Sequence, residues 1–226
     1  VSTHTVVVGQ LAKNDILTTT SGVSSLTSSI TNQATFFKFS YAGSNYTVSN
    51  IGAGTTLQGL VNFINNNATC SGKIRATTIF DGTNYHLQLY GMDQGASNQV
   101  VLTNMGSMVF QPTSFTNTQD AQSARVKIDG YPLGANVWLE RSSNTITDII
   151  PGVTLNLKQA DPNTSLTVGV TTDTNGVKQN IKNFIAQVNE VRSLIQSLTK
   201  VSDSSGATVG SILTGNYGIQ LIASQL

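Results

Sequence analysis

The sequence has little charge: charged residues make up 10% of its 226 residues, and the formal net charge is +1. Nucleic-acid-binding domains usually carry a clustered basic face, so this balance argues against nucleic acid as a partner. A single cysteine, Cys70, excludes an internal disulfide framework. The absence of any run of 18 apolar residues predicts that no helix crosses a membrane.

The first residues lack the features of a secretion signal. Val1-Ser2-Thr3-His4 contains neither a basic region followed by an apolar stretch nor an initiator Met. We therefore expect a trimmed or processed product, for which an export signal could lie upstream.

Residues for catalysis are scarce as well. His4 and His86 are the only imidazoles, and neither has metal-type spacing to Cys70 or to a carboxylate. Cys70 has no identifiable base to activate its thiol. Gly52-Ala53-Gly54 precedes an expected helix, but no Gly-Lys-Ser/Thr follows it, so a flexible helix entry is favoured over a phosphate loop. We expect no catalytic, metal or cofactor site and no enzymatic activity.

What the sequence has in abundance is Ser, Thr and Asn, together with strand-like patterns. Residues 36–41 and 46–48 flank a turn-rich gap and predict a hairpin, and residues 73–80 and 85–90 predict a second hairpin. Between the hairpins, Thr55 and Gln58 fit a capping box ahead of Leu57, Leu60, Val61 and Ile64 at helical spacing. With a strand at 100–102, this region predicts a compact α+β unit.

A second β-rich region is predicted beyond a loop-like segment at 108–120. Strands are expected at 124–128, 153–157 and 166–170, with a turn at Asp161-Pro162-Asn163. Residues 1–17 could return to this unit as an added strand. The first unit would then be an insertion within the second.

After Asp173 the apolar spacing becomes that of a long helix with a coiled-coil-like seam. The stripe steps by four and three residues through Val177, Ile181, Phe184, Val188, Val191, Ile195 and Leu198. The only further helix expected is 215–226, which is too short to cover it. We expect the missing partner helix to come from another chain or from sequence outside this one.

The most specific stretch is Arg141-Ser142-Ser143-Asn144-Thr145-Ile146-Thr147-Asp148-Ile149-Ile150-Pro151-Gly152-Val153. It resembles the flagellar hook-associated protein 2 family, the filament cap proteins. Val126-Lys127-Ile128-Asp129-Gly130 before it and Phe184-Ile185 after it fit the same order. Within the stretch, Asn144 and Asp148 are expected to bond local backbone in turns, and Gly152 to follow Pro151 in a tight bend.

The resemblance implies an α+β, mainly β fold, with two β-rich head domains followed by a helical leg. Residues 1–34 and 118–172 would form a discontinuous middle head domain, residues 35–117 an inserted outer head domain, and residues 173–226 part of the leg. The stripe from Val177 to Leu198 would pack the leg.

The function implied is a structural cap at the distal end of the bacterial flagellar filament that promotes assembly of exported flagellin. Its partners would be flagellin and copies of itself in a ring-like homo-oligomer, with no cofactor, at the extracellular tip of the flagellum. The alternative is an adhesin or phage-fibre-type module that binds carbohydrates, such as host surface glycans. A glycan-cleaving enzyme is third, since carboxylates brought together by folding are invisible in sequence spacing.

Overall fold

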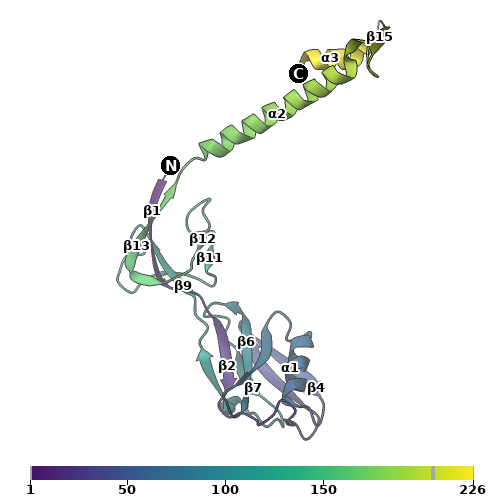
Figure 1. The fold of residues 1–226 in the computed structure, drawn as a ribbon. Coiled ribbons are helices and arrows are strands. Elements are labelled where there is room, and N and C mark those ends of the chain that lie inside the picture. The colour runs from purple at the N-terminus through teal and green to yellow at the C-terminus, as the bar shows by residue number, and fades with distance from the viewer. Residues whose placement is uncertain (1, 205–206, 226) are drawn as a thin grey trace. The chain divides into compact units, whose positions relative to one another are not determined.

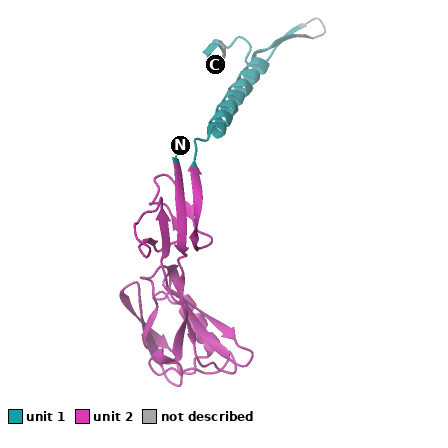
Figure 2. Ribbon diagram, turned by 90° about the vertical axis from the view of Figure 1, so that its left-hand side faces the viewer, with its two compact units in different colours: residues 1–2, 170–226 teal, residues 3–169 magenta. Residues whose placement is uncertain are grey.

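The computed structural model describes residues 2–204 and 207–225, which divide into two compact units. The larger unit is residues 3–169; the smaller contains residues 170–225 with Ser2. Figure 1 shows the elements in chain order and Figure 2 colours the two units. The ends of the expected middle and leg domains, Val1 and Leu226, and Ser205-Gly206 lie outside the described residues.

The larger unit contains two β modules. The first β module spans residues 14–119 and has two antiparallel sheets, ordered β5-β6-β2-β8 and β4-β3-β7. Its elements are β2 (Asn14–Thr19), β3 (Thr35–Tyr41), β4 (Ser44–Ile51), α1 (Leu57–Asn66), β5 (Ile74–Phe80), β6 (Tyr85–Gln94), β7 (Val101–Asn104), η1 (Pro112–Ser114) and β8 (Phe115–Gln119). Phe37, Phe39 and Phe110 are among the largest side chains of its core.

Helix α1 forms because its apolar residues fall on one face. Leu57, Leu60, Val61 and Ile64 are all buried, as the spacing predicted. The N-cap is Thr56, whose hydroxyl accepts from Gly59 N–H at 3.0 Å, one residue later than expected. Thr55 instead donates its hydroxyl hydrogen to Gly52 O at 2.7 Å, so its side chain braces the preceding turn.

The second β module has a four-stranded sheet ordered β10-β9-β1-β13 and the small pair β11-β12. The elements are β1 (Ser2–Gln10), β9 (Ala124–Ile128), β10 (Leu139–Arg141), β11 (Thr145–Ile146), β12 (Leu155–Asn156) and β13 (Asp161–Val170). β1 pairs antiparallel with β9, with Val6 opposite Ile128 and Val8 opposite Val126. Of the expected segment 1–17, the part in β1 therefore returns to this module, whereas residues 14–17 belong to β2 in the first module. The hydrophobic core of the second module is separate from that of the first and smaller. It has seven buried residues, against 21 in the first module.

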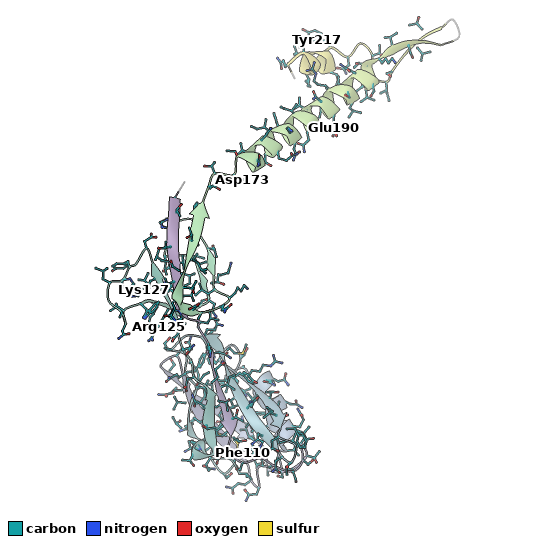
Figure 3. The ribbon with its side chains drawn as sticks, turned by 60° about the vertical axis from the view of Figure 1, so that its left-hand side comes forward. Phe110, Arg125, Lys127, Asp173, Glu190 and Tyr217 are labelled. Carbon is teal, nitrogen blue, oxygen red and sulfur yellow. The ribbon has the colours of Figure 1, made fainter. Side chains whose placement is uncertain are left out.

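The smaller unit is built on α2 (Thr174–Thr199) with the hairpin β14 (Val201–Ser204) and β15 (Ala207–Gly210), and it ends in α3 (Tyr217–Gln225). Both expected helices are therefore present. Phe110 lies among the side chains of the first module, whereas Glu190 and Tyr217 project from α2 and α3 (Figure 3). The α+β, mainly β fold class is confirmed.

The expected boundary at residue 35 lies too late in the chain. Strand β2 lies between β6 and β8, and Leu17 and Ile30 belong to the core of the first module. The Ser/Thr-rich segment 18–33 has no periodicity, so its pairing could not be read from sequence. Strand β8 was missed within the segment expected to be a loop, and β13 begins at the expected turn residue Asp161. Thr116, Asn117 and Thr118 at the centre of β8 are exposed polar residues that carry no alternating pattern.

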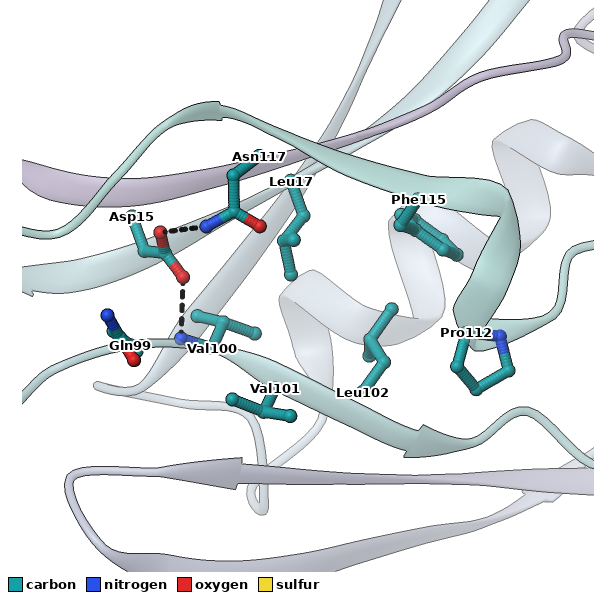
Figure 4. Close-up of a pocket in the computed structure, with 9 residues that line it drawn as sticks. All are labelled: Asp15, Leu17, Gln99, Val100, Val101, Leu102, Pro112, Phe115 and Asn117. Atoms are coloured by element: carbon teal, nitrogen blue, oxygen red, sulfur yellow. Dashed lines mark hydrogen bonds between the residues drawn. The ribbon is translucent and has the colours of Figure 1, made fainter.

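A buried carboxylate ties the two sheets of the first module together. Asp15 on β2 is 0% exposed and accepts hydrogen bonds from Val100 N at 2.7 Å, Asn117 Nδ2 at 2.9 Å and Ala121 N at 3.2 Å. Figure 4 shows the first two beside a pocket of about 280 Å³ between β7 and β8. Burial raises the pKa of Asp15, although the backbone donors oppose the shift. Both oxygens of the Asp15 carboxylate therefore accept hydrogen bonds from within the larger unit.

We expect Asp15→Ala to lower the free energy of unfolding of the larger unit by about 3 kcal/mol, because it leaves buried donors without an acceptor. Chemical denaturation measures this. Asp120→Ala, at an exposed neighbouring carboxylate, is the matched control and should change the value little. Equal effects of the two substitutions would contradict the role given to Asp15.

His86 joins the β5–β6 turn to the end of β2. Its Nδ1 lies 2.7 Å from Thr19 O and its Nε2 lies 2.8 Å from Asp81 Oδ2. Both partners only accept hydrogen bonds, so both contacts are satisfied at once by the doubly protonated ring. The Asp81 carboxylate and then the Thr19 carbonyl raise the pKa of His86. Asn84 N–H, the His86 ring and Thr83 N–H hold the pKa of Asp81 at about 2.

These shifts predict a pH-dependent contribution to stability. The His86 contribution is fully present below the unfolded pKa of 6.5 and is lost as pH rises through the higher folded pKa. The Asp81 contribution is present above 3.8 and is lost as pH falls toward about 2. Thermal unfolding at pH 5 to 9 should show the larger unit losing stability as the ring deprotonates, and His86→Gln should flatten that loss. If the loss of stability with rising pH is the same in His86→Gln and in Asp81→Asn as in the parent, the His86–Asp81 pair is not its source.

Candidate functional site

The candidate site in the smaller unit is the apolar stripe along α2. Asp173 caps the helix, its Oδ1 accepting from Gly176 N–H at 2.8 Å. The following residues run for 26 positions without proline. The chain then leaves through Lys200, and Leu213 N–H donates to Leu198 O at 3.0 Å. These contacts fix the helix ends but do not cover its length.

The stripe is largely exposed to solvent. Phe184 is 66% exposed and Val177 57% exposed, and none of the described α2 side chains is buried. Ile181 and Val191 are also exposed, while Val188, Ile195 and Leu198 are half-buried. Ile185 and Leu194, which the heptad pattern did not include, are more than half exposed and widen the apolar face. Exposed apolar surface of this extent makes the stripe a candidate interaction site.

The motif residues of the second module lie elsewhere. Asn144 contacts the backbone of Ala12, accepting from its N–H at 2.7 Å and donating to its carbonyl at 2.9 Å. Asp148 accepts from Arg141 Nε at 2.8 Å, and this hydrogen bond is the main cause of its lowered pKa. Gly152 has φ +76, a conformation that a side chain would strain. These three residues belong to the larger unit, whereas the stripe belongs to the smaller one.

Sequence reasoning missed two features. His4 Nδ1 lies 2.8 Å from Asp129 Oδ2, a pairing across 125 positions that no local pattern signals. The loop between β9 and β10 displays Tyr131 at 63% and Leu133 at 83% exposure, while Trp138 at the end of the same loop lies against Gly9. The apolar content of this loop was visible in the sequence, but its exposure was not.

The described residues contain no group of three or more His, Cys, Asp or Glu side chains that could hold a metal ion. Both nitrogens of the His86 ring are occupied, and burial raises the pKa of the Cys70 thiol to about 11, which leaves it an unreactive thiol at neutral pH. None of the described helices is long and apolar enough to cross a membrane.

The fold is that of the flagellar cap proteins. The crystal structure of the D1-D2-D3 domains of the Escherichia coli flagellar cap protein FliD matches over 99% of this chain and 62% of that one, with a TM-score of 0.78 and 25% identity. A Pseudomonas aeruginosa FliD structure matches over 90% of this chain with a TM-score of 0.69 and 19% identity, a likeness of fold.

The sequence comparisons give the family. Residues 121–226 match the model of the flagellar hook-associated protein 2 C-terminus. The A-type flagellar hook-associated protein 2 of Pseudomonas aeruginosa is 32% identical over 53% of this chain, and that of Aquifex aeolicus is 26% identical over 73%. The chain belongs to the flagellar hook-associated protein 2 family, as its sequence motif indicated. It spans 24% and 36% of the lengths of these two relatives.

Because α2 has no buried residue, its helicity should depend on local capping more than that of a packed helix does. We expect Asp173→Ala to cost about 1 kcal/mol of helix stability and to lower the far-UV circular dichroism signal at 222 nm. Asp173→Asn keeps an N-cap acceptor and should restore the signal. If Asp173→Ala leaves the signal unchanged, other contacts stabilise the first turn.

Proposed function

We propose that this chain is part of the structural cap at the distal end of the bacterial flagellar filament. There it promotes the assembly of exported flagellin subunits. It works outside the cell at the flagellum tip, in a homo-oligomer that contacts flagellin, and it needs no cofactor. Membership of the hook-associated protein 2 family and the match to cap-protein structures support this proposal.

The observation that carries the proposal is the uncovered stripe on α2. A 26-residue helix that exposes Phe184, Val177 and Ile181 loses their hydrophobic stabilisation unless another helix covers them. Covering these side chains with helices of the cap or of the filament end would bury the stripe on assembly. The proposed role is therefore mechanical. Helix α2 binds to helices of the cap or of the filament end, and the β modules are attached through the same chain.

The comparisons give no support to the adhesin alternative, and the relatives reported above are named as flagellar proteins. Host glycans are accordingly left out of the proposed partners.

The test uses the full-length protein in its own bacterium, with the double substitution Ile181→Asp and Phe184→Asp. Two charges on the stripe should prevent its burial, because an unpaired buried carboxylate is strongly disfavoured. We expect filaments to be short or absent, with at least tenfold more unpolymerised flagellin in the medium, measured by electron microscopy and quantitative immunoblotting.

The matched control is Gln179→Asp with Asn183→Asp, which adds the same charges on the other face of α2, where Gln179 Nε2 donates to Asn183 Oδ1 at 2.9 Å. This variant should keep filament length and swimming near wild type. Normal filaments in the stripe variant, at equal secreted amounts of the protein, would refute the role given to the helix.

A further inference from the structure

The two β modules are joined by a neck made of two chain segments. The chain passes from β1 to β2 through Leu11, Ala12 and Lys13 and returns through residues 120–123. Lys13 and Gln122 form an antiparallel bridge, with N–H to carbonyl distances of 2.9 and 3.1 Å. The two hydrophobic cores share no residue. No common apolar core therefore sets the angle between the modules, and a two-stranded ribbon by itself bends and twists easily.

Asn144 occupies the position of a third strand at this neck. Its side-chain amide pairs with the peptide of Ala12 in both directions: Oδ1 accepts from Ala12 N–H and Nδ2 donates to Ala12 O. This is the donor–acceptor pattern of a β-ladder pair, supplied by a side chain. Asp cannot donate, and Ser has no amide that could accept and donate at once.

The backbone of Asn144 is held in the second module. Its carbonyl accepts from Leu157 N–H at 2.8 Å, next to the β11–β12 pair. On the other side it meets the first module at Gln94, the last residue of β6, whose Oε1 lies 3.3 Å from Asn144 Nδ2 and 3.4 Å from Asn144 N. One residue thus contacts the second module, the neck and the first module.

Two nearby contacts brace the same joint. Gly95, with φ +108, approaches Ser142 so closely that an added Cβ would lie 2.6 Å from the Ser142 Cβ. Ala96 N–H donates to Ser123 Oγ at 3.2 Å. Beside them lies an open hollow of about 400 Å³, lined by Met92, Asp93, Gln94, Asn98, Ser142 and Ser143. Because the hollow is open, apolar packing there does not substitute for the polar contacts.

We propose that Asn144 is a positioning residue, a latch that fixes the orientation of the first β module on the second. The geometry also explains why an Arg-Ser-Ser-Asn segment precedes β11: Ser142 packs on Gly95 and Asn144 inserts at Ala12. The latch follows from the contacts of the neck alone and does not depend on the cap function proposed above.

The test measures the distance distribution between spin labels on the two modules, in the 226-residue chain. Labels go at Asn45→Cys in the first module and Asn136→Cys in the second, both at exposed positions. Cys70 is fully buried with a thiol pKa of about 11, so it should remain unlabelled. We expect Asn144→Ala to broaden the distribution at least twofold.

Thr145→Val is the matched control. It removes the 3.0 Å hydrogen bond from Thr145 Oγ1 to Asn156 Oδ1, inside the second module and one residue from the latch. Its distribution should match the parent. If Asn144→Ala does not fold, Asn144→Asp serves in its place, since it keeps the acceptor for Ala12 N–H and loses the donor; it should broaden the distribution as well.

Melting temperature and hydrogen exchange in β6 and β9 report on the cores of the two modules. Broadening with both cores intact supports the latch. A distribution as narrow as the parent's in folded Asn144→Ala or Asn144→Asp overturns it, as does equal broadening in Thr145→Val.

Discussion

The backbone bridge between Lys13 and Gln122 is the interaction on which the larger unit depends. It closes a loop of more than a hundred residues, inside which the first β module has its own core. Outside the loop, the same two chain segments continue as β1 and β9, whose register sets Val6 and Val8 beside Val126 and Ile128. The sheet of the second module therefore forms from strands far apart in the sequence. The entropy of closing that loop is offset when the first module is already compact.

The smaller unit has a different balance of forces. In the larger unit most large apolar side chains are buried, whereas α2 has no described buried residue and α3 exposes Tyr217, Leu221 and Ile222. A single helix in water is marginally stable even at favourable lengths, because most helical stability in proteins comes from packing. The chain thus combines β modules that carry their own cores with a long helix, α2, that has no buried side chain.

The sequence could predict elements whose local pattern was strong. The hairpin of β3 and β4, helix α1 and the long helix α2 were predicted because period two or period 3.6 ran through each of them. Strand β8 was not predicted, since its pairing with β2 depends on polar residues such as Asn117, which contacts Asp15 across 102 positions. The functional residues, too, were only partly predictable from the sequence. The stripe from Val177 to Leu198 was visible as spacing, but the contact of Asn144 with Ala12 spans 132 positions and has no local signature.

The scarcity of charge decides how distant segments are tied together. Apart from the two histidine pairs, the recorded ion pairs within the described residues are Arg125 with Glu140 and Arg141 with Asp148, and these join neighbouring parts of one module. Beside the buried carboxylate of Asp15 and the His4–Asp129 pair, distant segments are also tied together by neutral amides such as Asn144 at the neck. Hydrogen bonds of this kind are insensitive to pH and are not screened by salt, whereas exposed ion pairs weaken with ionic strength. Because hydrogen bonds are directional, they also fix the angle between the segments that they join, which a non-directional apolar contact does not. A polar, nearly uncharged composition therefore leaves the contacts at the neck little affected by ionic strength.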